Sequence, residues 1–382
     1  MTGRSKRRAY VVGFYGVANF GDDLFCDVVE SHAALMFPGY DVRIVGRVTQ
    51  PRTALKRAFR RIFASPHSAG SAIRLLTGLW VVARGDLIIL GGGSVLSELR
   101  GVRYVQWKLS RILRTRFRAV GVSLGPFADM KRRGAVATFA QGLDKLIVRD
   151  SRSLDVGHSL GLDHSLTLGG DLAALYAPPT TELPGVRHGH IGLSLCSISG
   201  AESNDPDLIT RSLADAILQM PESERMTVVV LSLNNHKIHG DDEVSENAVR
   251  HLRERGIEVK YSRYIDVGVE GVWNEIASLQ AVVAVRLHAA ICAYLAGVPF
   301  ALVEYHSKCT DFCNDIGQHD SMRIPASADR STLSTAVSAL LKVPCSPAVS
   351  PDAYSARAVA TYLSYGVSVG STLSDQKVMA YQ

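Results

Sequence analysis

The residues best suited to chemistry lie close together in the second half of the chain. Residues 281–299 read AVVAVRLHAAICAYLAGVP, in which an apolar strand ends at Arg286 and a helix of small residues starts after His288. A guanidinium at a strand end can bind a carboxylate or phosphate through two hydrogen bonds, and an imidazole at a helix N-terminus can transfer a proton. The alternatives are an interdomain salt bridge for Arg286 and a satisfied core histidine for His288. Burying both groups in an apolar segment is unfavourable without partners, so the Arg-X-His pattern favours a functional pair.

Two further cations follow predicted strands. Arg149 comes directly after one apolar run, and Lys308 comes shortly after another. Both could hold an anionic group, although an ion pair with Asp150 or Asp171 is the alternative for Arg149. The histidines and cysteines around Lys308 match no familiar ligand spacing, so we expect no metal site.

The segment GVANFGDD, at residues 16–23, follows the first predicted strand. Asn19, Asp22 and Asp23 could orient a sugar hydroxyl there, or they could serve only to start the next helix. The sequence predicts that this helix begins near residue 23, with Asp22 as its N-cap.

A triple glycine lies at the end of another predicted strand. Residues 86–98 read DLIILGGGSVLSE, which predicts a strand, a glycine loop and then a helix. Such a loop exposes backbone N–H groups, so Gly92 and Gly93 are candidates for contacting an anion. A tight packing turn is the alternative, since neither a Walker loop nor a dinucleotide fingerprint is present.

These residues need a scaffold that brings strand ends together. Short apolar runs alternate with helical segments along the chain, which predicts an α/β fold with parallel sheets flanked by helices. The predicted strands are residues 9–14, 41–45, 86–90, 118–124, 145–148, 190–195, 227–233, 258–261, 281–285 and 300–303. Ligands of such sheets bind beyond the carboxyl ends of the strands, where the candidate residues lie.

The length of 382 residues predicts two domains, because a single core seldom grows so large. We expect an N-terminal Rossmann-like domain over residues 1–177 and a proline-rich linker over 178–189. A C-terminal Rossmann-like domain over 190–345 and a helical tail over 346–382 follow. The last helix, near residues 352–365, is expected to pack back across the first domain.

The composition is that of a globular cytoplasmic protein. Six cysteines are widely scattered, which fits reduced thiols better than a disulfide framework. No apolar run approaches the roughly 20 residues needed to cross a bilayer, so we expect a soluble protein.

A basic segment precedes the triple glycine. Lys56, Arg57, Arg60 and Arg61 surround an apolar helical face, which could lie on an anionic membrane at its inner surface. A solvated basic helix over a core is the other interpretation. Nucleic-acid binding is not expected, because no recognition motif accompanies these charges.

Taken in order, the segments GVANFGDDL, LGGGSVLSE, GVSLGP, VRDSRS, GGDLA and RLHAAICAYLAGVP resemble the polysaccharide pyruvyl transferases of bacterial envelope and exopolysaccharide pathways. The similarity runs from about residue 9 to 315. It implies two Rossmann-like domains similar to the type B glycosyltransferase (GT-B) architecture, with an acceptor side in the first domain and a donor side in the second.

The resemblance also implies a reaction and its residues. Phosphoenolpyruvate is the implied co-substrate, a sugar or lipid-linked oligosaccharide is the acceptor, the product is a ketal, and no further cofactor is needed. Arg149, Arg286 and His288 match family positions linked to donor binding and catalysis, and Lys308 matches a basic residue after the last strand. The alternatives are a GT-B glycosyltransferase that uses a nucleotide-sugar, and a non-catalytic sugar-binding homologue.

Overall fold

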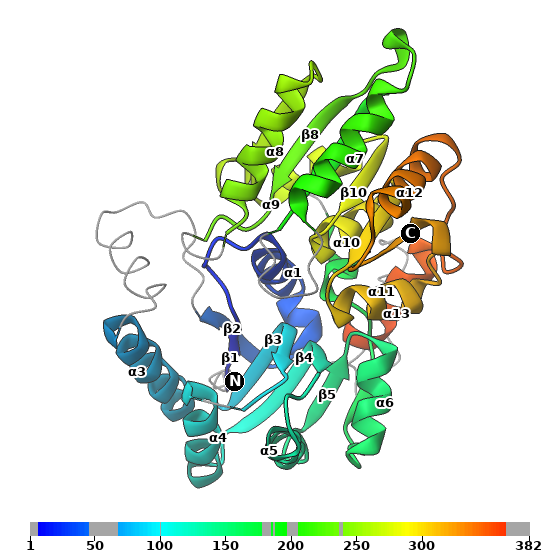
Figure 1. Cartoon of the computed structure of the whole chain (residues 1–382). Helices are drawn as coiled ribbons and strands as arrows, with labels where there is room; N and C mark the ends of the chain where they lie inside the picture. Colours follow the sequence, from blue (N-terminus) through cyan, green and yellow to red (C-terminus); the bar gives the residue numbers. More distant parts are fainter. Residues whose placement is uncertain are drawn as a thin grey trace.

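The described part of the protein forms two parallel six-stranded sheets with flanking helices (Figure 1). The structure, a computed structural model, describes residues 7–45, 68–99, 101–177, 185, 188–196, 205–236 and 240–363. This architecture confirms the predicted α/β fold with two Rossmann-like units. The basic segment around Lys56 and most of the predicted linker lie outside the described residues.

The first sheet has the strand order β2-β1-β3-β4-β5-β6. Its central strands are mostly apolar and buried along most of their length, as parallel strands with covered faces require. The elements are β1 Arg7–Val12, α1 Phe20–Met36, β2 Tyr40–Val45, α3 Ser68–Arg84, β3 Leu87–Leu96, α4 Gly101–Leu113, β4 Arg116–Leu124, α5 Met130–Ala140, β5 Lys145–Val148, α6 Ser151–Ser159, β6 Leu166–Leu168 and the 3-10 helix η1 Leu172–Leu175.

The second sheet has the order β12-β11-β10-β7-β8-β9, with β10 and β7 at its centre. The elements are β7 His190–Ser194, α7 Pro206–Leu218, η2 Glu222–Glu224, β8 Thr227–Ser232, α8 Asp242–Glu254, β9 Val259–Arg263, α9 Tyr264–Ala277, β10 Ala281–Ala284, α10 Leu287–Leu295, β11 Phe300–Glu304, α11 Ser307–Ile316, η3 Asp320–Met322, β12 Arg323–Pro325, α12 Arg330–Lys342 and α13 Pro351–Tyr362. None of the described helices is long and apolar enough to cross a membrane.

The triple glycine does not end its strand, and the predicted helix after it is wrong. β3 continues through the glycines to Leu96, and α4 begins only at Gly101. Gly92 and Gly93 adopt φ values of 68° and 78°, which favour glycine, and the register with β4 shifts just after them. This irregularity bends β3 without ending its pairing, because β4 is long enough to receive the strand again.

The first helix also begins differently from the prediction. α1 starts at Phe20 with Asn19 as its N-cap residue, so Asp22 lies in the first turn and is not the cap. A bridge between Asn19 and Asn234 of the second domain fixes this start, together with a hydrogen bond from the Phe20 N–H to the Leu233 carbonyl. The helix start is therefore set by a contact between domains that local sequence does not report.

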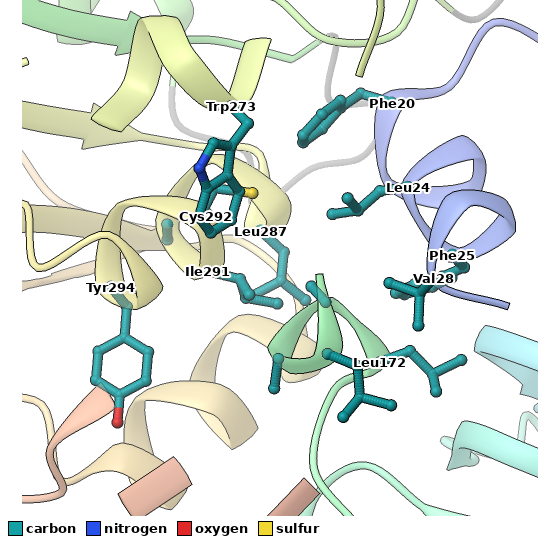
Figure 2. Close-up of a cluster of buried hydrophobic side chains, with 14 of the residues drawn as sticks. Phe20, Leu24, Phe25, Val28, Leu172, Trp273, Leu287, Ile291, Cys292 and Tyr294 are labelled. Carbon is teal, nitrogen blue, oxygen red and sulfur yellow. The ribbon is translucent and has the colours of Figure 1, made fainter. Parts of the chain in front are cut away.

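One apolar cluster joins the two domains. Phe20, Leu24, Phe25 and Val28 of α1 face Leu172 of η1 and the second-domain residues Trp273, Leu287, Ile291 and Cys292 (Figure 2). These side chains are nearly all fully buried. Because burial of one such side chain stabilises by about 1.5–3 kcal/mol, this shared core holds the two sheets against each other.

The last helix packs back across the first domain, as expected. Tyr354 and Tyr362 of α13 are buried against η1. The hydroxyl of Tyr354 accepts a hydrogen bond from the Asp171 N–H at 2.8 Å, and that of Tyr362 donates to the Gly170 carbonyl at 2.6 Å. α13 thereby fixes the loop that carries Asp171.

Candidate functional site

A cavity of about 210 Å³ lies between the carboxyl ends of the two sheets. It is lined by residues that follow β1, β5, β8, β10 and β11, and by the bent part of β3. Seven of the nine residues selected from the sequence line it, namely Asn19, Asp22, Gly93, Arg149, Arg286, His288 and Lys308. The parallel topology thus gathers groups that are far apart in the chain.

Arg149 is held rigidly at the end of β5. Its guanidinium donates to Ser123 Oγ at 2.7 Å and to Ser94 Oγ at 3.2 Å, and it lies 3.4 Å from Asp171 Oδ2. Asp150 adds a longer ion pair at 3.7 Å, so both anticipated partners are present. The side chain is only 6% exposed, which orients it toward the cavity before any ligand arrives.

Arg286 pairs with Asp241 of its own domain, so the alternative considered for it, an interdomain salt bridge, is not the ion pair that forms. Nε donates to Oδ2 at 2.8 Å, and Nη2 donates to Oδ1 of the same carboxylate. Burial opposes the charge, but the two bonds to Asp241 raise the pKa of Arg286 and keep it cationic. Nη1 forms no hydrogen bond with the described residues, so this edge of the guanidinium can contact a ligand.

Lys308 lies in the first turn of α11 and lines the same cavity. Burial lowers the pKa of its ammonium, and the neighbouring Arg149 and Arg286 act in the same direction. Three cations therefore repel one another around one space. An anion bound there would relieve this repulsion, which is the expected signature of a site for a multiply charged ligand.

His288 lies in the first turn of α10, and its ring lines the cavity. Its Nε2 atom is buried and has no hydrogen-bond partner among the described residues. Burial lowers the pKa of the imidazole to about 4, and the charges of Arg149 and Lys308 add to the effect. The ring is thus neutral near pH 7 and can accept a proton.

Gly21 provides the space that the His288 ring occupies. A Cβ at this position would lie 2.0 Å from Nδ1 of His288, while Phe25 packs edge-on against the ring at 5.2 Å. Only a glycine allows the imidazole to lie between α1 and the cavity.

Replacing Gly21 by alanine should displace the His288 ring and lower activity by about 100-fold, the typical effect of misplacing a reacting group by about 1 Å. Overpacking of this kind costs about 1–3 kcal/mol of stability, and the better helix propensity of alanine offsets part of that cost. Gly134→Ala is the matched control, because the added Cβ meets nothing within 4 Å in α5. Equal activity of Gly21→Ala and wild type would show that the ring position is unimportant.

The pKa of Asp22 is also strongly shifted in this cavity. Burial raises the pKa of its carboxyl to about 7, with a further contribution from Asp23. Asn19 opposes this shift by donating to Oδ2 at 2.5 Å, as do the charges of Lys308 and Arg149. A substantial fraction of Asp22 therefore carries a proton at neutral pH, whereas His288 does not.

The other two selected residues do not line the cavity. Asp23 accepts from the Gly16 N–H at 2.9 Å and from the Tyr264 hydroxyl at 2.8 Å, so it joins α1 to the second domain. Gly92 lies against Phe25, whose ring would be 2.1 Å from an added Cβ, which matches the packing alternative.

Several groups in and around the cavity were missed from the sequence. Ser94 and Ser123 orient Arg149, and Asp241 orients Arg286. Ser94 directly follows the triple glycine, where the sequence predicts a strand end, and this position was the signal available for finding it. No such signal marked Asp241. Among the described residues, no cluster of histidine, cysteine and carboxylate side chains is suited to hold a metal ion.

Solved structures of sugar enzymes share this two-domain architecture. The S. aureus MnaA structure with UDP has a TM-score of 0.57 at 12% identity and covers 95% of this chain and 93% of that chain. The UDP-GlcNAc 2-epimerase from Methanocaldococcus jannaschii has a TM-score of 0.58 at 11% identity, and the match covers 94% of this chain and 99% of that chain. A putative UDP-N-acetylglucosamine 2-epimerase from Listeria monocytogenes has a TM-score of 0.57 at 12% identity, and the match covers 95% of this chain and 93% of that chain. The fold is therefore of the GT-B class.

The family model for polysaccharide pyruvyl transferase matches residues 19–307. The chain belongs to the polysaccharide pyruvyl transferase family and is a transferase of polysaccharide biosynthesis, which confirms the resemblance noted in its sequence. No curated protein matches the sequence.

Proposed function

We propose that the protein transfers a pyruvyl group from phosphoenolpyruvate to a sugar of a cell-envelope polysaccharide or exopolysaccharide. The observation that supports this best is the convergence of Arg149, Arg286 and Lys308 on one cavity that also holds Asp22 and His288. Phosphoenolpyruvate carries a carboxylate and a phosphate, so it needs several fixed cations. Its acceptor is a free or lipid-linked sugar, and the reaction takes place in the cytoplasm or at the inner face of the membrane.

The two arginines differ in the freedom of their guanidinium groups. The guanidinium of Arg149 is held by hydrogen bonds to two serines and by an ion pair with Asp171, so its orientation toward the donor is fixed. Nε and Nη2 of Arg286 bond to Asp241, so Nη1 is the atom that can contact the donor. Lys308 supplies a point charge that can follow either anionic group.

Asp22 and His288 divide the proton transfers, because their surroundings shift their pKa values in opposite directions. Asp22 donates its proton to the methylene carbon, which makes the adjacent carbon oxocarbenium-like. A sugar hydroxyl then adds to that carbon and gives its proton to neutral His288. The carbon–oxygen bond to phosphate breaks with its electron pair on phosphate, which takes the proton from His288. A second hydroxyl of the sugar then closes the ketal, and its proton returns to Asp22. One donor and one sugar diol give one ketal and one hydrogen phosphate.

Two other functions fit the same architecture. The similar structures from S. aureus and M. jannaschii are bound to UDP or named for UDP-GlcNAc, which favours a nucleotide-sugar glycosyltransferase as the second candidate. A non-catalytic sugar-binding protein is the third. A buried acid beside a neutral imidazole speaks against that third candidate, since a binding site does not need opposed pKa shifts.

Calorimetry with phosphoenolpyruvate and with UDP tests the proposal. We expect heat of binding with phosphoenolpyruvate and none with UDP, and we expect phosphate release when extracts of the host's acceptor glycans are added. Mass spectrometry of the host polysaccharide should show a pyruvate ketal that disappears when the gene is deleted. Binding of UDP without binding of phosphoenolpyruvate would support the glycosyltransferase instead.

A further inference from the structure

Helices α3 and α4 lie next to each other at one side of the first domain (Figure 1). They expose an unusual amount of apolar surface. Half of the large apolar side chains that are exposed among the described residues belong to these two helices. They are Leu75, Leu76, Trp80, Tyr104, Val105, Ile112 and Leu113. Leu76 is 65% exposed and Ile112 is 77% exposed, so neither belongs to the core. The two helices pack directly against each other, and their exposed apolar side chains together are named here the α3–α4 face.

The charge of this surface has one sign. Lys108, Arg111 and Arg114 are exposed on or beside α4, and none forms an ion pair with a described residue. The sequence contains no carboxylate between Glu98 and Asp129, nor between Asp41 and Asp86. Lys108 lies over the rings of Tyr104 and Trp107, at 5.5 Å and 5.0 Å from their centroids. Trp107 is buried and Tyr104 is exposed, so the cations lie beside one exposed ring and among exposed aliphatic groups.

The first turn of α4, at one end of the α3–α4 face, adjoins the cavity. Arg103, in the first turn of α4, donates to the Val95 carbonyl and lies 5.3 Å from the centre of the Phe14 ring. Phe14 and Val95 both line the cavity, and Phe14 is 59% exposed. A substrate held beside α4 would therefore start close to the reacting groups.

We infer that the α3–α4 face binds an anionic phospholipid bilayer. Apolar side chains of this kind enter the boundary between headgroups and acyl chains, while lysine and arginine contact the anionic headgroups. Such binding would present a lipid-linked acceptor at the mouth of the cavity. The inference rests on this surface alone and holds whichever reaction the cavity performs.

Two other partners fit the surface less well. A second copy of the chain would bring the same cations against each other, without carboxylates from these helices to pair with them. A nucleic acid would use the cations but would leave Leu76 and Ile112 exposed to water. A bilayer satisfies both the charge and the apolar groups.

Co-sedimentation of the full-length protein with phosphatidylcholine vesicles, with and without phosphatidylglycerol, tests the inference. We expect binding only to the anionic vesicles, weakened by salt because exposed charges are screened. Leu76→Ser/Ile112→Ser and Lys108→Glu/Arg111→Glu should each weaken binding by about tenfold or more. The matched controls are Met130→Ser/Val343→Ser and Lys131→Glu/Lys342→Glu, which change equally exposed residues elsewhere and should bind like wild type.

Several outcomes would overturn the inference. Vesicle binding that the α3–α4 variants leave unchanged would place the contact elsewhere. A dimer in sedimentation velocity that Leu76→Ser/Ile112→Ser dissociates would assign the surface to a second copy. The inference would be supported if these variants lost vesicle binding and still turned over a soluble acceptor. That result would show that the substitutions leave the reaction itself unaffected.

Discussion

Replacing Asp22 by asparagine should lower turnover by about 100-fold or more, the usual range for loss of a general acid. Asparagine keeps the size of the side chain and can still pair with Asn19, but it has no proton to give to the donor. The wild-type rate should fall as pH rises through about 7, where Asp22 loses its proton. The residual rate of Asp22→Asn should lose this dependence.

The pH dependence of stability tests the shifted pKa of Asp22 independently of catalytic activity. The pKa of Asp22 is about 7 in the folded protein, against an ordinary value of 3.8. Between these values the folded state holds a proton that the unfolded state has released, so stability falls as pH rises across this range. Asp22→Asn removes the decline. The unfolding midpoint of Asp22→Asn minus that of wild type should therefore be larger at about pH 8 than at about pH 5.

Two variants serve as comparisons for Asp22→Asn. Asp23→Asn changes the neighbouring carboxyl, which does not line the cavity, and should lose much less activity. His288→Asn should also lose turnover, but its residual rate should still fall through about pH 7, because Asp22 remains. Turnover of a folded Asp22→Asn protein close to wild type would remove Asp22 from the mechanism.

The positions of the candidate residues could be predicted because one topological rule decides them. Parallel strands end at one edge of a sheet, so a polar residue directly after a buried strand faces that edge. Arg149 and Arg286 follow β5 and β10, whose apolar runs are evident in the sequence. No knowledge of the partner domain was needed to place these two groups.

The triple glycine shows where local pattern is insufficient. Glycine can end a strand or bend it, and the choice depends on whether the neighbouring strand continues. β4 does continue, to Leu124, and receives β3 again at Leu96. The edge strands β6 and β12 were missed for a related reason, since each has three residues and too few for an alternation or an apolar run.

The opposite pKa shifts of Asp22 and His288 could not be predicted from the sequence. Both follow from burial, and the burial of His288 comes from Gly21 and Phe25 of the other domain. A helix that begins with polar residues is ordinarily solvated at that end. Here the contact between the domains through Asn19 and Asn234 shields the N-terminal end of α1 from solvent.

Arg286→Ala should remove donor binding, but it should also destabilise the protein. Asp241 is fully buried and loses its guanidinium partner in this variant. Removing one member of a buried ion pair costs about 3–5 kcal/mol, and the lower end applies because Arg286 is 20% exposed. Loss of phosphoenolpyruvate binding in this variant alone would therefore not distinguish a missing contact from a loosened site.

The double variant Arg286→Ala/Asp241→Asn separates the two effects. Neutral asparagine needs no cation, so the unfolding midpoint should recover most of the loss, whereas donor affinity should not recover. Arg286→Lys should keep the protein stable and restore affinity only in part, because an ammonium has no planar fork that forms two bonds to Asp241 and leaves a further edge for the donor. If the double variant bound phosphoenolpyruvate as tightly as wild type in calorimetry, Arg286 would serve only to neutralise Asp241. The donor would then be held by Arg149 and Lys308.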